Sequence, residues 1–528
     1  MKQLVDSLLA ARDVSTPLLA ITTPDQPAVV EGLRAALNGT IPIVSWDRAR
    51  GFLALNDKGL AAMTVVANAI NIQITDMPAA SADPAAAMRY AIHLPKQSVV
   101  LALSMDRFLK EPPAGEVVQA VLNLRDAFKS NQRTLVMLAP DFDWPIELRH
   151  DVILLDDPLP DESGYATIIR DLYVSAELGK TVKNGKTTYE PSPDIMSKAT
   201  LAVRGLSAFE AEQVLAMSLA LSPKRDGIDL ASAWDLKKRA VGKVKGLSMT
   251  LDGPSLSDLR GLNQIVGMME DLFHGPEPPL VIVRVDEIDK SMAGLGSRGG
   301  PGDNTGVSQD LHQQFLTTME DYDWVGAILA GIRGSGKTVL TQSIGAAYGI
   351  PTIAMDTGAM KGKHVGESEA AFRDAFRTIR SIGGSRVAVL ATANELDVLP
   401  PELIRRFKLG IWYFDLLTKE ERDSLWPVYL KRYGHPLNSP RPNDENWTGA
   451  EIRNCCEIAY KLRKTVAEVG TKYIVPVTKS DPTSVQELRK IATDRFLSAS
   501  YPGTYHPEHM TVEPTAAARR LTLGAKES

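Results

Sequence analysis

The sequence predicts an α/β protein with two sheet-containing blocks, each followed by a helical segment. In the first part of the 528-residue chain, the apolar runs PLLAITT, SVVLALS, RTLVMLA and DVILLDD alternate with amphipathic stretches. The alternation returns from about residue 259 to 417, with VIVRVD, VGAILAG, IPTIAMD, RVAVLATA and GIWYFDL. Such alternation predicts parallel sheets with helices on their faces. From about residue 160 to 240, strand signals are absent and helical periodicity dominates, and residues 179–194 form an expected loop.

The composition limits the class of protein. With 44% hydrophobic residues and a formal net charge of −5, the chain has the usage of an ordinary protein with buried cores. No long run of one charge sign occurs, which argues against a dedicated nucleic-acid or membrane-surface binder. Cys455 and Cys456 are the only cysteines. As neighbours they cannot staple distant segments or build a zinc site, and a cytoplasmic location is expected.

The N-terminal stretch MKQLVDSLLAARDV has apolar residues at helical spacing, interrupted by Asp6, Arg12 and Asp13. It predicts a surface helix, because a signal peptide has an uninterrupted apolar core. No apolar run reaches the roughly 18 residues that span a bilayer, so no membrane association is expected.

The stretch GIRGSGKT fits the phosphate-loop pattern G-x-x-x-x-G-K-[ST] (Walker A). Glycines let backbone N–H groups close around phosphate oxygens, and the following helix presents its positive end. A glycine-rich surface turn is the alternative, but the apolar run VGAILA leads in and helical spacing follows. The predicted phosphate-binding residues are Gly331, Ile332, Arg333, Gly334, Ser335, Gly336, Lys337, Thr338 and Val339.

The apolar run VIVRVDEID ends in Asp286 and Glu287. A carboxylate at a strand end can hold Mg²⁺ through water, and its neighbour can polarise the attacking water of a hydrolysis reaction (Walker B). Arg284 is discordant, because a guanidinium in a sheet covered on both faces needs a partner.

Further blocks extend these two motifs. AVLATANELDVLPPELIRRF places Asn394 at a strand end before a P-P-E-L-x-R-R-F turn. GESEAAFRDAF, WTGAEIRNCCEIA and SDLRGLNQIV add to the pattern. These blocks cover roughly residues 257–462, and together they resemble the AAA ATPases. The resemblance implies a P-loop NTPase fold, with a parallel five-stranded sheet and a helical lid.

By that resemblance, the cofactors are ATP and Mg²⁺. Lys337 would contact the β- and γ-phosphates, and Thr338 and Asp286 would hold Mg²⁺. Glu287 would act as general base, and Asn394 would orient the attacking water.

The resemblance also assigns residues at the edges of the site. Leu259 would border the adenine, and Gly449 and Ala450 would close over it from the lid. Arg405 and Arg406 would reach into a neighbouring subunit as arginine fingers, which implies a ring, expected to be hexameric. An ordinary solvated basic pair is the alternative for the two arginines.

Protein-threading members of the family carry an aromatic residue, an apolar residue and glycine just before G-E-S-E. This chain has His364, Val365 and Gly366 there, which weakens the case for a strong unfoldase. SMAGLGSRGGPGDNTG follows the acidic strand, where a second pore loop would lie, and a flexible connector is the alternative.

The N-terminal block resembles a degenerate copy of the same domain. PLLAITTPDQ takes the place of a strand and phosphate loop without lysine or glycine, and SVVLALSMDRF offers only Asp106 for an acidic pair. No nucleotide is expected there. A degenerate domain ahead of an intact one resembles the layout of plastid and cyanobacterial AAA proteins. The expected domains are residues 1–160 (degenerate AAA-like), 161–245 (helical, lid-like), 246–417 (AAA core), 418–500 (helical lid) and 501–528 (flexible tail).

The order of the motifs is unusual, because the acidic strand precedes the phosphate loop. In AAA ATPases the sheet runs as second strand, acidic strand, sensor strand, phosphate-loop strand and fifth strand. If every strand keeps its place, two crossovers must each span one extra strand spacing, roughly 5 Å. Right-handed connections then leave each helix on its usual face.

The leading hypothesis is an ATP-hydrolysing AAA protein that assembles into a ring and remodels an unknown protein partner. A nucleotide-dependent switch or scaffold without mechanical work is the alternative from another class. A nucleic-acid motor or loader is less favoured, because no basic stripe stands out.

Overall fold

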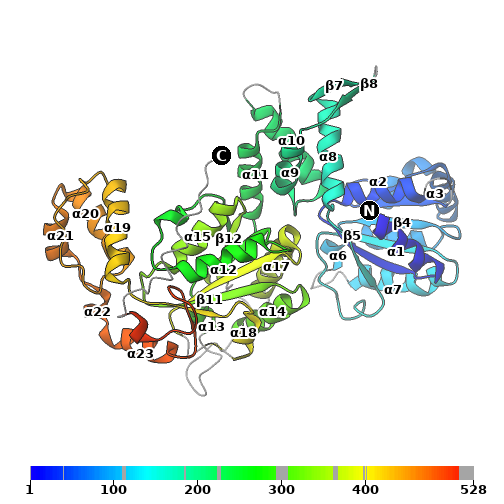
Figure 1. Ribbon diagram of the computed structural model, residues 1–528. Helices are drawn as coiled ribbons and strands as arrows, with labels where there is room; N and C mark the ends of the chain where they lie inside the picture. Colours follow the sequence, from blue (N-terminus) through cyan, green and yellow to red (C-terminus); the bar gives the residue numbers. More distant parts are fainter. Residues whose placement is uncertain are drawn as a thin grey trace. The chain divides into compact units, whose positions relative to one another are not determined.

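The computed structural model describes residues 2–37, 39, 41–109, 115–183, 186–222, 227–292, 307–360, 367–395, 399 and 401–510. The chain divides into two compact units, Met1–Ala233 and Trp234–Ser528 (Figure 1). The boundary falls inside helix α11 (Leu230–Val241), within the segment 161–245 that the sequence assigned to one helical domain.

The first unit contains a six-stranded sheet in the order β3-β2-β4-β5-β1-β6. Neighbouring strands are parallel except for the β2–β3 pair. The strands are β1 (Leu18–Thr22), β2 (Ile43–Asp47), β3 (Gly51–Ala54), β4 (Val99–Leu103), β5 (Thr134–Ala139) and β6 (Ile153–Asp156). The sequence predicted β1, β4, β5 and β6 but missed β2 and β3, which interleave apolar with polar or small residues.

Helices cover this sheet and then continue as a separate group. The helices of the sheet region are α1 (Lys2–Asp13), α2 (Gln26–Leu37), α3 (Asp57–Ala69), α4 (Met77–Ala80), α5 (Pro84–Ala91), α6 (Asp106–Leu109) and α7 (Gly115–Lys129). The helical group contains α8 (Glu162–Ser175), α9 (Pro193–Val203), α10 (Ala208–Leu221) and α11. Within it, strands β7 (Lys180–Lys183) and β8 (Lys186–Tyr189) form an antiparallel hairpin. The expectation of a loop at residues 179–194 was therefore wrong.

The second unit contains a seven-stranded sheet in the order β15-β14-β11-β13-β10-β12-β9. The strands are β9 (Leu247–Thr250), β10 (Val281–Val285), β11 (Val325–Gly331), β12 (Thr352–Met355), β13 (Val387–Ala393), β14 (Ile411–Phe414) and β15 (Leu497–Ser498). The central five are parallel, as predicted, and the α/β fold class is confirmed. The sequence missed the antiparallel edge strand β9 and the two-residue strand β15.

The acidic strand β10 lies between β12 and the sensor strand β13, and the phosphate-loop strand β11 lies on the other side of β13. This is the arrangement expected if each strand keeps its place in the sheet. The first unit provides an internal comparison, because β2, β4, β5, β1 and β6 occupy the corresponding places in the same order. There the chain visits β1 first, whereas in the second unit it enters at the acidic strand.

Helices cover both faces of the second sheet (Figure 1). One face packs against α12 (Asn263–His274) and α15 (Lys337–Tyr348) through Ile265, Leu340 and Ile344. The other face packs against α14 (Val307–Asp321) and α17 (Glu367–Gly383). The short helices are α13 (Ile288–Met292), α16 (Thr357–Met360) and α18 (Pro401–Arg406).

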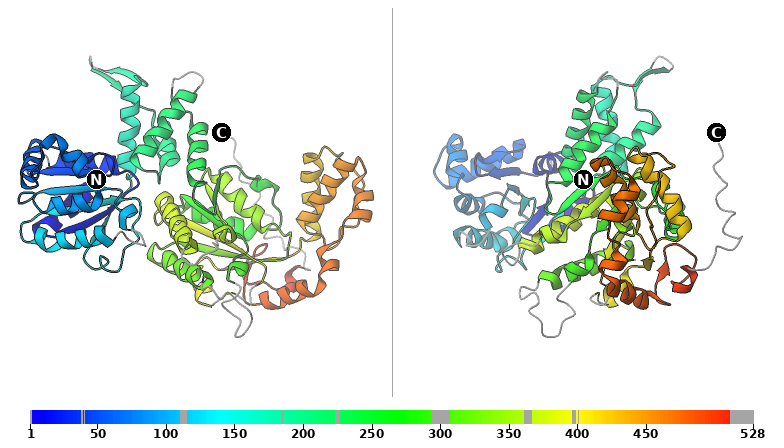
Figure 2. Two further views of the ribbon diagram at one scale, coloured as in Figure 1. Left: turned by 180° about the vertical axis from the view of Figure 1, so that it is seen from behind. Right: turned by 90° about the vertical axis from the view of Figure 1, so that its left-hand side faces the viewer.

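The lid helices form a group of their own beside the sheet (Figure 2, orange). They are α19 (Lys419–Arg432), α20 (Gly449–Leu462), α21 (Val466–Tyr473) and α22 (Val477–Ser480). Capping boxes begin α19 at Thr418 and α20 at Thr448. The lid core contains Trp426 and the two free cysteines, all fully buried.

After the lid, the chain returns to the sheet through α23 (Pro482–Ala492), whose Leu488 and Ala492 pack in the main core. The segment that follows pairs with β14, and Tyr505 is fully buried. The expected flexible tail was therefore placed too early at residue 501. Residues 511–528 lie outside the described part of the chain.

Candidate functional site

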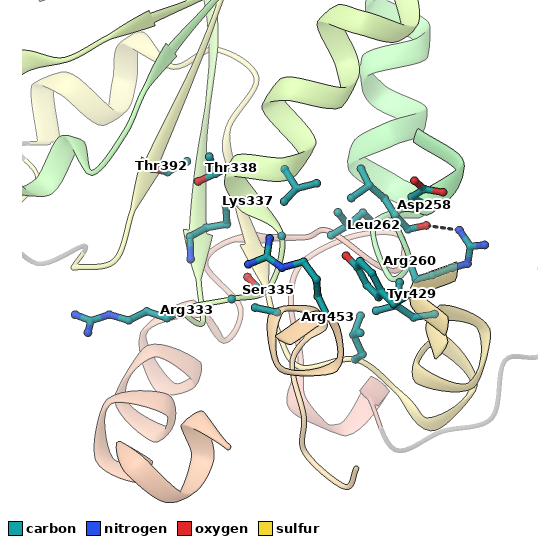
Figure 3. Close-up of a pocket in the computed structure, with 18 of the residues that line it drawn as sticks. Asp258, Arg260, Leu262, Arg333, Ser335, Lys337, Thr338, Thr392, Tyr429 and Arg453 are labelled. Atoms are coloured by element: carbon teal, nitrogen blue, oxygen red, sulfur yellow. Dashed lines mark hydrogen bonds between the residues drawn. The ribbon is translucent and has the colours of Figure 1, made fainter. Parts of the chain in front are cut away.

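A cavity of about 440 Å³ lies where the carboxyl ends of β10, β11 and β13 meet the lid (Figure 3). Ligands of open α/β sheets bind at this edge, outside the carboxyl ends of the strands. The sequence-predicted residues that line it are Leu259, Asp286, Glu287, Arg333, Gly334, Ser335, Gly336, Lys337, Thr338, Val339, Asn394, Gly449 and Ala450.

The phosphate loop owes its shape to three glycines. Gly331, Gly334 and Gly336 have φ values of 133°, 81° and 101°, which side chains other than glycine rarely adopt. A Cβ at Gly331 would lie 2.2 Å from the carbonyl oxygen of Phe414. The Ala450 N–H of the lid donates to the Gly334 carbonyl at 3.2 Å, so the lid contacts the loop directly.

Lys337 begins helix α15 with its amine inside the loop. Its Nζ donates to the carbonyl oxygens of Gly331 at 2.7 Å and Ile332 at 3.0 Å. Burial lowers the pKa of Lys337 to about 8, and the negative charge of Asp289 partly opposes that shift. An anion beside this amine would favour its charged form.

The end of the acidic strand is tied to the sensor strand. Glu287 has a φ of 51°, and its N–H donates to Thr392 Oγ1 at 3.0 Å. Its carboxylate accepts from Asn394 Nδ2 at 3.2 Å and from Lys290 Nζ at 2.7 Å. The Asn394 N–H donates to buried Asp289 at 3.3 Å, and burial raises the pKa of that carboxyl. Glu287 and Asn394 are thereby held together at the cavity.

Arg284, which the sequence left without a partner, lies close to Asp286. Its Nε is 2.9 Å from Asp286 Oδ2. Asp286, which is expected to hold Mg²⁺, therefore already has the Arg284 guanidinium beside it.

At its far end, the cavity is lined on one side by residues just before α12 and on the other side by the lid. Arg453 reaches into it from α20, and Tyr429 from α19 (Figure 3). Tyr429 was missed because no motif marks its helix. Arg453 was missed although it lies in the quoted stretch WTGAEIRNCCEIA, three residues after Ala450, and that position was the available signal. The lining residues that were not predicted are Asp258, Arg260, Leu262, Thr392, Leu417, Leu425, Tyr429 and Arg453.

Four predicted residues do not line this cavity. Gly331 and Ile332 lie behind it and present their carbonyl oxygens to Lys337. Arg405 is exposed on α18, and Arg406 Nη2 is 2.6 Å from Glu320 Oε2. The pore position at His364, Val365 and Gly366, and most of the second pore segment, lie outside the described residues.

Two stretches of the chain match known families. Residues 327–385, which include the phosphate loop and β12, match the ATPase family associated with various cellular activities (AAA). This stretch of the chain is therefore similar to an AAA domain. Residues 1–156 match the N-terminal domain of SpoVK-like AAA ATPases, so the sheet region of the first unit is also similar to proteins of this group.

Relatives that match most of the chain are named for an AAA domain. The "Uncharacterized AAA domain-containing protein ycf46" of Guillardia theta is 22% identical, over 90% of this chain and 92% of the relative. The protein of the same name from Trieres chinensis is 22% identical, over 92% and 96%, respectively. That of Pyropia yezoensis is 19% identical, over 90% and 95%. The similarity therefore extends across both units.

The residues that line the cavity fit a magnesium nucleotide. Among the described residues, the Ser335 hydroxyl has no hydrogen-bond partner although Ser335 is only 9% exposed. The carboxylate of Asp286 and the hydroxyl of Thr338 are oxygen ligands of the kind that Mg²⁺ prefers. In the part of the chain that the structure describes, no cluster of three or more His, Cys, Asp or Glu could hold a metal by itself. The described helices include none that is long and apolar enough to cross a membrane.

Proposed function

We propose that the AAA domain binds ATP with Mg²⁺ and hydrolyses it. The observation that carries this proposal is the Glu287 carboxylate, held by Asn394 at 3.2 Å in the same cavity as Lys337 and Thr338. A general base needs an orienting partner and a nearby electrophile, and phosphates in the loop would supply the electrophile.

The functional groups of the cavity residues suggest a role for each of them. The N–H groups of the phosphate loop bind phosphate oxygens, and Lys337 turns from the loop carbonyls to the anion. Thr338 and Asp286 would hold Mg²⁺, which neutralises charge on the phosphates when bound. Glu287 takes the proton of the attacking water, and Asn394 fixes the direction of the carboxylate. Leu259, Gly449 and Ala450 enclose the adenine.

We further propose that the chain assembles into a ring, expected to be hexameric, and remodels a protein partner in the cytoplasm. Arg405 supports assembly, because it is exposed and outside the cavity of its own chain. The two buried free cysteines support a reducing compartment. The strand order supports the view that each strand of the AAA core keeps its usual place in the sheet although the acidic strand precedes the phosphate loop in the chain.

Two substitutions test hydrolysis. Lys337→Ala should abolish ATP binding, whereas Glu287→Gln should bind ATP, hydrolyse it at least about 100-fold more slowly and elute as an assembled species. Lys198→Ala is the matched control, because it removes an exposed lysine that pairs with Asp194 on α9, outside the cavity. A Lys337→Ala protein that hydrolyses ATP at the parent rate contradicts the proposal.

A nucleotide-dependent switch or scaffold is the second candidate. It is favoured because both acids are engaged by cations, Asp286 by Arg284 and Glu287 by Lys290, which would slow turnover. ATP-dependent assembly that is identical in the parent and Glu287→Gln proteins, with no measurable turnover in either, would select this function. Salt-sensitive binding to DNA would instead revive a nucleic-acid motor or loader.

A further inference from the structure

Arg284 is the fourth residue of the buried strand β10. Its neighbours in register are Ala354 on β12 and Leu390 on β13, so neither offers a charge. Residues two apart on a strand point to the same side, which brings Arg284 towards Asp286. The Arg284 side chain is 16% exposed and that of Asp286 is 41% exposed. The guanidinium is thus largely buried, while the carboxylate opens into the cavity.

The contact between the two is an ion pair without hydrogen-bond alignment. Nε lies 2.9 Å from Oδ2, yet among the described residues Nε has no hydrogen-bond partner. A buried guanidinium that is incompletely satisfied gains strongly from a nearby negative charge. Any second cation at Asp286 must therefore share that charge with Arg284.

We propose that Arg284 sets the Mg²⁺ requirement of this site by competing for the Asp286 carboxylate. The inference rests on the proposed function, since it assumes that Asp286 serves a nucleotide-associated Mg²⁺. The pair weakens Mg²⁺ binding and leaves the affinity for metal-free nucleotide unchanged, because the phosphate loop and Lys337 do not depend on it. Arg284 acts through Asp286 and is a positioning residue.

The test titrates Mg²⁺ into protein that carries a fluorescent mant derivative of ATP bound in EDTA. Arg284→Met keeps the length of the side chain and removes its charge, so the Mg²⁺ midpoint should fall by about fivefold to tenfold. Arg284→Lys should restore a midpoint near that of the parent. Arg386→Met is the control, because Arg386 Nε donates to the Pro278 carbonyl at the other end of the same sheet.

An Asp286→Asn background separates competition from a structural role. There, Arg284→Met should no longer shift the Mg²⁺ midpoint, because the shared charge is gone. A midpoint that is unchanged or higher in Arg284→Met with Asp286 intact overturns the proposal. Should Arg284→Met fail to fold, Arg284→Gln carries the same test. A parent protein that binds no mant-ATP, with or without Mg²⁺, overturns the proposed function, whereas binding with an unshifted midpoint overturns only the role of Arg284.

Discussion

Under the proposed function, Lys337 would link proton binding to nucleotide binding. Burial lowers its pKa to about 8, so above that pH the free protein carries a mostly neutral amine. Phosphate oxygens in the loop favour the charged form and raise the pKa again. At pH 8.5 nucleotide binding should therefore take up a proton, and this uptake should fade below pH 7.

Isothermal titration in buffers of different ionisation enthalpy measures this uptake. The parent protein should give a binding enthalpy that depends on the buffer at pH 8.5. Lys290→Ala should behave like the parent, because Lys290 is exposed on the neighbouring turn. A binding enthalpy that is independent of the buffer at pH 8.5 would mean that Lys337 is already charged in the free protein.

The two candidate arginine fingers differ in their surroundings. Arg406 forms an ion pair with Glu320, whereas Arg405 has no ion pair among the described residues. Arg405→Ala should lower ATP hydrolysis of the assembled protein by at least about 100-fold, with ATP binding unchanged. Arg406→Ala loses an exposed pair worth at most about 1 kcal/mol and should lower the rate far less. The rates are measured at protein concentrations that favour assembly. An equal loss of ATP hydrolysis in both variants would contradict the different roles expected for Arg405 and Arg406.

Local motifs made most of the lining residues predictable at this scale. Short motifs at strand ends or in loops identify Lys337, Asp286, Glu287 and Asn394, because each motif spans only a few residues. Arg453 and Tyr429 were missed because their side chains reach the cavity only after the lid has folded. Arg284 was left without a partner, although Asp286 lies two residues further on and such residues share one side of a strand.

At the scale of elements, the phosphate loop depends on the backbone freedom of Gly331. A Cβ there would meet the Phe414 backbone at 2.2 Å, and the φ of 133° is strained for any other residue. Gly331→Ala should destabilise the second unit by about 3 kcal/mol. Gly349→Ala, at the end of α15, also has positive φ but open space, and should cost only about 1 kcal/mol.

Urea unfolding followed by tryptophan fluorescence measures both glycine variants. The second unit contains most of the tryptophans of the chain: Trp234, Trp324, Trp412, Trp426 and Trp447. Equal midpoints for Gly331→Ala and Gly349→Ala would show that the loop relaxes around the new methyl group.

The segment after α23 is held by a buried polar cluster. Tyr505 Oη donates to Asp415 Oδ2 at 2.5 Å, and Arg489 Nη2 donates to Asp415 Oδ1 at 2.8 Å. The Ala499 carbonyl of the same segment accepts from the Gln264 N–H at the start of α12, close in sequence to the cavity-lining residues Leu259 and Leu262. The segment therefore connects the core of the sheet to one wall of the cavity.

Tyr505→Phe should destabilise the second unit by about 2 kcal/mol, because the Asp415 carboxylate loses a buried hydrogen bond. It should also weaken ATP binding, since the wall at α12 loosens. Tyr460→Phe is the control, because that ring is 63% exposed. Unchanged thermal unfolding and ATP affinity in Tyr505→Phe would show that the pairing of β15 with β14 holds the segment without this hydrogen bond.

Strands were predictable where the sequence contains a continuous apolar run. The five central strands of the second sheet are continuous apolar runs, as expected for parallel strands buried on both faces. The hairpin β7–β8 was missed although the dipeptide Asn184-Gly185, typical of tight hairpin turns, stands in its sequence. Strand β15 has only two residues and depends on pairing with β14, so no local pattern marks it.

At the scale of the whole molecule, the two sheets have corresponding places but different chain orders. In the first unit the chain runs β1, β2, β4, β5, β6, whereas in the second it runs β10, β11, β12, β13, β14. The places themselves bring Asp286, Asn394 and Lys337 to one edge of the sheet. The site should therefore depend on the places of the strands and not on the order in which the chain visits them.

This independence can be tested by moving residues 281–324 to follow Arg386. All three junctions then fall just before parallel strands, whose starting ends lie at the same edge of the sheet. Leu280 N–H already donates to the Arg386 carbonyl at 2.8 Å, so two of the joined ends are neighbours. The remaining joins span one or two strand spacings, roughly 5–10 Å, which the six residues 275–280 and the turn at 322–324 can cover.

The reordered chain should fold and bind mant-ATP with an affinity within about threefold of the parent, because each strand keeps its place and right-handed crossovers can make the new connections. Thermal unfolding and mant-ATP titration measure the two properties. The control inserts the same segment after Gly434, in the lid, where strand β10 cannot reach its place. A reordered chain that folds but loses ATP binding would show that the loops at Asp286 and Asn394 need the present connections. A chain that fails to fold would show that chain order itself stabilises this sheet.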